Sequence, residues 1–217
     1  MEFDLLENLG EVMAIQEAPI TDESAVLEYL DVEILEKKNF ISEVDEMRVD
    51  ETAEIMAEVF TEEVLNSWSE MSQEEKTEKL NEYYIKAGEN LGIETKGVIV
   101  EPMPSEPGMI AFGYNSGDGY IHLNEEIVND PDWLGQVLDT ATHEMRHQFQ
   151  SDVLASPERF PDIPKDVLAE WRYEMDPRNY INPDYDFEGY YNQTIERDAR
   201  EYSANVLEAF TDKMNLN

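Results

Sequence analysis

The chain has 217 residues, of which 51 are acidic and 15 are lysine or arginine, so its formal net charge is −36. This balance excludes nucleic acids and anionic membranes as partners, because both are bound through clusters of basic side chains. It favours basic partners or substrates, or a salt-rich environment. Cysteine is absent, which excludes disulfides and thiolate metal sites and leaves histidine and carboxylate side chains as the available zinc ligands.

Length and hydropathy set two further expectations. The length suits one domain with a sizeable core, or one domain with an appendage. No apolar run approaches the roughly 20 residues that cross a bilayer, and the acidic first residues lack the basic start of a signal peptide. We therefore expect a cytoplasmic protein, or one exported without a cleaved signal peptide.

The first fifty residues are rich in glutamate and aspartate and contain only short apolar clusters. We interpret residues 1–50 as an acidic N-terminal appendage that is helical or partly ordered, with disorder as the competing interpretation. The main domain is then expected to span residues 51–217.

Helical spacing begins in residues 51–70, where apolar side chains recur every three to four positions. A second helix is predicted to follow, because Ser72 and Glu75 match a capping box. Its apolar positions continue to Gly92, a residue type that commonly ends helices.

Three short strands are predicted next, at residues 97–101, 109–114 and 120–123. The turn-rich residues 115–119 predict a hairpin between the last two. Together with the flanking helices, these strands predict an α+β fold with a small, mostly antiparallel sheet.

The most informative segment is His143-Glu144-Met145-Arg146-His147, on a predicted helix that begins with Asp130 as N-cap and Pro131 in the first turn. Its apolar stripe comprises Leu134, Leu138, Ala141, Met145 and Phe149. This stripe faces the core, and the histidines project from the other side of the helix. Asp139, one turn before His143, is expected to orient that imidazole or to be a solvated carboxylate.

This H-E-x-x-H pattern carries a chemical interpretation. Residues four apart lie on the same helix face, so His143 and His147 can bind one metal ion. A zinc ion with an open position lowers the pKa of its water to about 7, and Glu144 is placed to take the proton. The competing interpretation is a surface helix with two solvated histidines.

The third ligand is expected from a separate element. A further helix is predicted from the stripe Ile195, Ala199, Tyr202, Val206 and Phe210. Glu196 lies at the inner edge of this stripe near the helix start, which makes it the preferred candidate. The competing interpretation is that Glu196 is exposed to solvent. Asp198 and Glu201 are the other carboxylates close to it in sequence. Asp198 points about 200° away from Glu196, so the two cannot both face the metal.

Residues 152–191 hold most of the prolines and many of the aromatic side chains. This segment is too apolar for a disordered linker, and a helix is predicted within it at residues 165–174. We expect it to cover the core and to form one wall of a cleft.

The motifs resemble the gluzincin metallopeptidases, in which a second helix supplies a glutamate ligand after the H-E-x-x-H helix. Glu196-Arg197-Asp198-Ala199 is similar to their E-x-x-A pattern. The resemblance covers about residues 75–217. It implies a zincin-like metallopeptidase domain with a helical C-terminal part, with His143, His147 and Glu196 as Zn²⁺ ligands and Glu144 as general base.

One position departs from that family. Thermolysin-like and prenyl-protease-like members have an aspartate about four residues after the ligand glutamate, where this chain has Arg200. Asp198 is the expected substitute in the role of orienting a ligand.

Substrate contacts are expected in two places. The edge strand of a zincin sheet pairs with an extended substrate, and residues 120–123 are the candidate, which brings Tyr120 and His122 to the site. Tyr202 is a candidate for stabilising the oxyanion, and a core position is its alternative.

The resulting hypothesis is a zinc-dependent peptidase acting on a peptide or protein substrate, and the acidic charge favours a basic one. The alternative is an acidic metal-binding or pseudo-enzyme interaction module that binds a basic protein partner. A nucleic-acid mimic also fits the acidity, but it leaves the H-E-x-x-H unexplained. In either case residues 1–50 are expected to be dispensable for zinc binding.

Overall fold

The computed structural model describes residues 41–106, 109–183 and 185–215, which adopt a mostly helical α+β fold. The helices are α2 (Glu43–Val59), α3 (Glu62–Ser67), α4 (Gln73–Leu91), α5 (Glu125–Asn129), α6 (Leu134–Ala155), α7 (Lys165–Glu174), α8 (Phe187–Tyr191) and α9 (Thr194–Met214). Single 3-10 turns are η1 (Trp68–Glu70), η2 (Pro131–Trp133) and η3 (Pro157–Arg159). The strands are β1 (Gly97–Glu101), β2 (Ser105–Glu106), β3 (Met109–Ile110), β4 (Gly113–Asn115) and β5 (Tyr120–Asn124).

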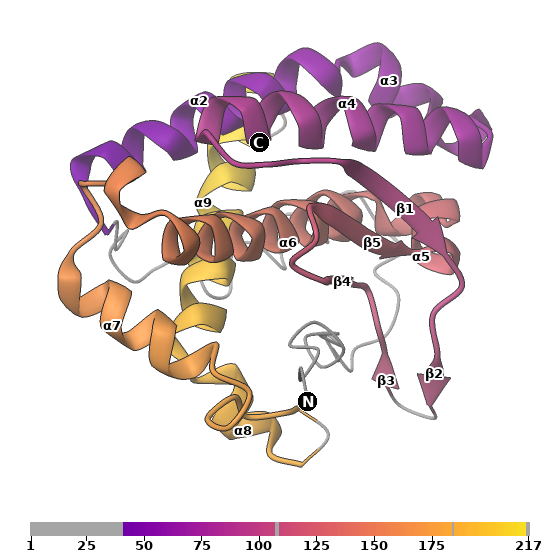
Figure 1. Cartoon of the computed structure of the whole chain (residues 1–217). Helices are drawn as coiled ribbons and strands as arrows, with labels where there is room; N and C mark the ends of the chain where they lie inside the picture. Colours follow the sequence, from indigo (N-terminus) through magenta and orange to yellow (C-terminus); the bar gives the residue numbers. More distant parts are fainter. Residues whose placement is uncertain (1–40, 107–108, 184, 216–217) are drawn as a thin grey trace.

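Helix α6 lies at the centre of the fold (Figure 1). It contacts α4 and the sheet on one side and α7 and α9 on the other, and α9 crosses behind it to reach α2. Each helix in the described part of the chain is too short or too polar to span a membrane.

The main sheet is mixed, with the order β1-β5-β4. Strand β5 pairs in parallel with all five residues of β1 and antiparallel with the three residues of β4. The expected mostly antiparallel sheet is therefore corrected to a mixed one. The segment predicted as one strand at 109–114 divides into β3, which pairs with β2, and β4.

This order also corrects the choice of edge strand. Strand β5 is hydrogen-bonded on both sides, so its backbone has no free edge for an added substrate strand. The edges are β1 and β4. Strand order depends on which distant segments pair, and the local alternation that predicts a strand carries no such information.

The helical segment expected at residues 51–70 divides among the end of α2, α3 and η1, whereas the later helix predictions are confirmed. The Ser72–Glu75 capping box is present at the start of α4, and Gly92 ends that helix with a left-handed φ of 72°. Asp130 caps η2 by accepting a hydrogen bond from the backbone of Asp132, and α6 follows directly. Helix α7 has the predicted bounds.

One hydrophobic core joins the helices and the sheet. Among the predicted stripe positions of α6, all but the partly buried Leu134 are buried, and all five predicted positions of α9 are buried. The segment 152–191 adds Phe160, Ile163 and Trp171 to this core, as expected of a covering element.

The expected boundary after residue 50 does not coincide with the end of an element. Helix α2 runs through it, and Asp45 and Val49 are buried at 3% exposure each. Residues 41–50 thus belong to the packed domain. The rest of the expected appendage, residues 1–40, lies outside the described residues.

Candidate metal centre

Two imidazoles of α6 face each other at the centre of the fold. His143 and His147 are four residues apart on the helix, and their rings meet edge to face with centroids 4.6 Å apart. Their Nε2 atoms are 2.9 Å apart. Both side chains are almost completely buried, so the interpretation as solvated surface histidines is excluded.

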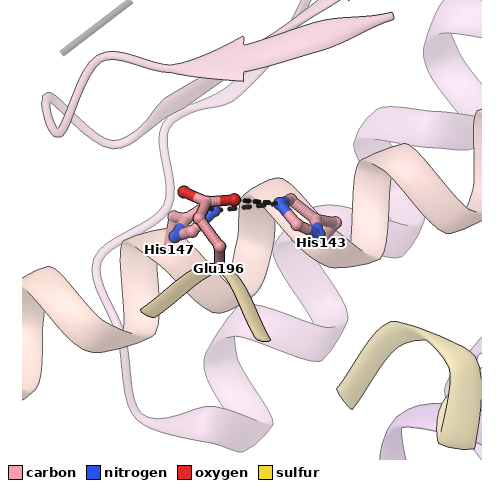
Figure 2. A group of neighbouring side chains, drawn as sticks. All are labelled: His143, His147 and Glu196. Atoms are coloured by element: carbon pink, nitrogen blue, oxygen red, sulfur yellow. Dashed lines mark hydrogen bonds and ion pairs between the residues drawn. The ribbon is translucent and has the colours of Figure 1, made fainter. Parts of the chain in front are cut away.

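Glu196 reaches this pair from the first turn of α9 (Figure 2). Its Oε2 atom is 3.6 Å from Nε2 of His143, and its Oε1 atom is 3.6 Å from Nε2 of His147. Zinc bonds of about 2.0–2.1 Å at tetrahedral angles separate ligand atoms by roughly 3.3 Å. The Nε2–Nε2 separation of 2.9 Å is shorter than that value, and the two separations of 3.6 Å between Glu196 and the histidines are longer. All of the ligand atoms lie within 4.8 Å of one another.

The protonation states of His143 and Glu196 suit a cation. Burial lowers the pKa of His143 to about 4, so its imidazole is neutral at pH 7. Burial alone would raise the pKa of Glu196, but the imidazoles of His147 and His143 hold it below its usual value. Neutral imidazole and ionised carboxylate are the forms that bind metals.

Unsatisfied polar atoms provide an independent test of the fit. Neither carboxylate oxygen of Glu196 has a hydrogen-bond partner among the described residues, although both are buried, and the same holds for Nδ1 of His143. A buried ionised carboxylate without donors is costly. A cation bound between Glu196 and the two histidines removes this cost, and their nitrogen and oxygen atoms are a usual zinc ligand set.

Glu144 lies between the two histidines in sequence and is fully buried. Its backbone carbonyl accepts a hydrogen bond of 2.9 Å from the side-chain amide of Asn115, at the end of β4. This bond fastens the edge strand β4 to the turn of α6 that carries the motif. The side chain of Asn115 thus fixes the sheet next to the candidate general base.

A buried ionic network lies next to the cluster. Arg146 is fully buried and donates to both carboxylate oxygens of Asp198, at 2.8 Å each, and to both of Asp45, at 2.8 and 3.0 Å. Burial alone would lower the pKa of Arg146, but Asp198 and Asp45 raise it above its usual value. The guanidinium also lies over the rings of Phe149 and Tyr202.

The two alternative carboxylates on α9 are not part of the cluster. Asp198 binds Arg146 and Gln150, as its position on the opposite face from Glu196 predicts. Glu201 is partly exposed and lies 4.0 Å from Arg197.

The predicted substrate-binding residues lie in different environments. His122 is hydrogen-bonded to Glu101, with Nδ1 of the imidazole 2.7 Å from Oε1 of the carboxylate, and its ring stacks on that of Tyr114. Tyr120 lies at the start of β5, with the ammonium of Lys96 5.5 Å from its ring centre. Both belong to the central strand, so neither offers a free backbone edge.

Tyr202 is a core residue. It is buried, and its hydroxyl forms a 2.9 Å hydrogen bond with the hydroxyl of Thr52 on α2. Tyr202 thus takes the core position, which is the alternative to a role in stabilising the oxyanion.

Asp139 and Arg200 each contact a residue outside the cluster. Asp139 accepts a hydrogen bond of 3.2 Å from Gln136, and burial raises its pKa to about 6. It does not orient His143, whose Nδ1 atom has no partner in the described part of the chain. Arg200 donates to the backbone carbonyl of Tyr191 and stacks over that ring.

Sequence reasoning missed Gln150 and Asp45. Gln150 contacts His147, and Asp45 contacts Arg146. The contact of Gln150 could have been predicted from its spacing, because residues three apart on a helix are neighbours. No local signal links Asp45 to a residue 101 positions away.

Comparisons of the chain with protein-family models, curated proteins and solved structures find no match.

Proposed function

We propose that this protein is a zinc-dependent peptidase of the gluzincin type, with His143, His147 and Glu196 as the zinc ligands. The observation that carries the proposal is the meeting of these three buried side chains from two helices. Three protein ligands are the number typical of catalytic zinc sites, which keep one position open.

The roles of the side chains follow from their chemistry. The imidazoles of His143 and His147 and the carboxylate of Glu196 would hold the ion. When bound, zinc supplies Lewis acidity and lowers the pKa of water to about 7. Glu144 accepts the proton from the attacking water and donates it to the amine nitrogen that leaves when the peptide C–N bond breaks. The net charge of −36 favours approach of basic peptides.

A second candidate function rests on the burial of the centre. His143, Glu144 and Glu196 are each 0% exposed and His147 is 4% exposed. Such enclosure favours a non-catalytic metal centre within an acidic module that binds a basic protein. A peptidase with this structure must open to admit its substrate.

Glu144→Gln separates the two functions, because it preserves side-chain size but removes the base. We expect the variant to keep zinc and to lose hydrolysis of a library of basic and neutral peptides. The two proteins are compared at equal zinc content. Equal hydrolysis by the zinc-loaded wild type and variant, or none by either, would contradict the peptidase proposal and favour the binding module.

A further inference from the structure

Gln150 links a candidate metal ligand to the ionic network. It is fully buried on α6, one turn after His147. Its Oε1 atom lies 2.9 Å from Nδ1 of His147. Its amide nitrogen donates to the backbone carbonyl of Ile195 at 2.9 Å and to Oδ2 of Asp198 at 2.7 Å.

These contacts fix the orientation of the Gln150 amide. A backbone carbonyl and an ionised carboxylate only accept hydrogen bonds, so the two groups near the amide nitrogen require its two N–H donors. The carbonyl oxygen of Gln150 must then face His147. Because that oxygen only accepts, Nδ1 of His147 must carry the hydrogen. With the hydrogen on Nδ1, Nε2 of His147 carries a lone pair and can act as a hydrogen-bond acceptor or a metal ligand.

The network prevents the opposite arrangement. A flipped Gln150 amide would place its carbonyl oxygen against the backbone carbonyl of Ile195 and Oδ2 of Asp198, so that acceptors would face acceptors and both hydrogen bonds would be lost. Asp198 cannot turn away, because Arg146 donates to both of its oxygens. Arg146 is itself held by Asp45 of α2.

His143 lacks such a partner. Its Nδ1 atom is buried without a hydrogen bond in the described part of the chain, and its Nε2 atom lies 2.9 Å from Nε2 of His147. Since His147 carries its hydrogen on Nδ1, the hydrogen between the two Nε2 atoms belongs to His143. The two histidines therefore hold opposite tautomers before a metal binds.

We propose that Gln150, held by Asp198, is a positioning residue that keeps His147 in the metal-binding tautomer. This inference rests on the proposed metal centre and deepens it. Hydrogen bonds behind a ligand orient it and raise its basicity, and their loss typically weakens metal binding about 10- to 100-fold.

The first test measures tautomers in the metal-free full-length chain at pH 7.5. Two-bond ¹H–¹⁵N correlation spectra of imidazoles distinguish Nδ1–H from Nε2–H, and the chain has only three histidines to assign. We expect Nδ1–H at His147 and Nε2–H at His143. A hydrogen on Nε2 of His147 in the wild type would overturn the inference, whatever the activity of the protein.

The second test compares Gln150→Met with Gln148→Met for zinc affinity, by competition with a chromophoric chelator. Gln148 is a matched control, because it is buried on the same helix and its amide donates to a carboxylate, Asp152, at 2.9 Å. We expect Gln150→Met to lose zinc affinity about 10- to 100-fold and Gln148→Met to change it less than about threefold. Equal losses, or no loss in Gln150→Met, would contradict the proposed role.

The outcomes separate this inference from the peptidase proposal. A zinc-binding wild type without hydrolysis removes the peptidase function but leaves the role of Gln150 standing if the tautomer and affinity results hold. A wild type that binds no zinc removes both the metal centre and the positioning role. If Gln150→Met does not fold, the tautomer of His147 in the wild type still tests the inference.

Discussion

Asp45 of α2 and Arg146 of α6 form two parallel hydrogen bonds, 2.8 and 3.0 Å long, between residues 101 positions apart in sequence. The pair is buried, and Arg146 directly precedes the candidate ligand His147. Helix α2, at the acidic start of the described chain, is thus joined to the central helix α6 through the buried positive charge of Arg146, which carboxylates neutralise.

Removing Asp45 is expected to destabilise the protein strongly. Asp45→Asn leaves the buried Arg146 with one carboxylate, and breaking a buried pair in this way costs about 3 kcal/mol in the free energy of unfolding. Urea denaturation measures the change. Glu46→Gln, at an exposed neighbouring position, serves as the control and is expected to stay within about 0.5 kcal/mol of the wild type.

Shortened chains test where the domain begins. A chain that starts at Ile41 retains Asp45 and Val49, so we expect it to fold and to bind zinc. A chain that starts at Thr52 lacks both and is expected to be unfolded by circular dichroism, because it loses a buried ion-pair partner and part of the core. A folded, zinc-binding protein from Thr52 would restore the boundary that the sequence suggested.

The sequence allows the prediction of features whose signals are local. Ser72 and Glu75 predict a capping box because both partners lie within one turn, and His143 and His147 meet because four residues span one turn. Glu196 is predictable because its helix carries a clear apolar stripe and because the motif needs a third ligand. The structure brings these three candidate ligands together.

The remaining features depend on distant pairings. The parallel pairing of β1 with β5 places β5 in the middle of the sheet, which no alternation pattern reveals. The same applies to Asp45, which looks like one of many solvated carboxylates in an acidic segment. The position of Tyr202 on its helix is compatible with a core or with a cleft, and only its hydrogen bond to Thr52 shows that it lies in the core.

The identity of the third ligand is tested by comparing Glu196→Gln with Glu201→Gln, which lies on the same helix outside the cluster. We expect Glu196→Gln to lose more zinc affinity than the roughly 10- to 100-fold that follows loss of a hydrogen bond behind a ligand. Glu201→Gln should bind zinc as the wild type does. Unchanged zinc affinity in Glu196→Gln would remove this residue from the site.

The metal-free protein is expected to lose stability on mild acidification. Burial lowers the pKa of His143 to about 4 in the folded state, against about 6.5 in the unfolded chain. As the pH falls below about 6.5, the unfolded state takes up a proton that the folded state does not, so the loss begins there and continues toward pH 4. Between pH 7 and pH 5 this group contributes a loss of about 2 kcal/mol.

The variant His143→Gln isolates that contribution, since the many carboxylates titrate in both proteins. Urea unfolding at pH 7 and pH 5 should show a smaller decrease in the free energy of unfolding for the variant. An equal decrease in the two proteins would show that the pKa of His143 is not depressed by burial.

Metal analysis of the full-length protein tests the central claim most directly. The protein is purified without chelators, incubated with one equivalent excess of zinc, freed of unbound ions and measured by mass spectrometry of the elements. Binding at His143, His147 and Glu196 predicts about one zinc per chain, and predicts its loss in the double variant His143→Ala, His147→Ala. A folded wild type that retains no zinc, or a double variant that retains as much, would contradict the metal centre.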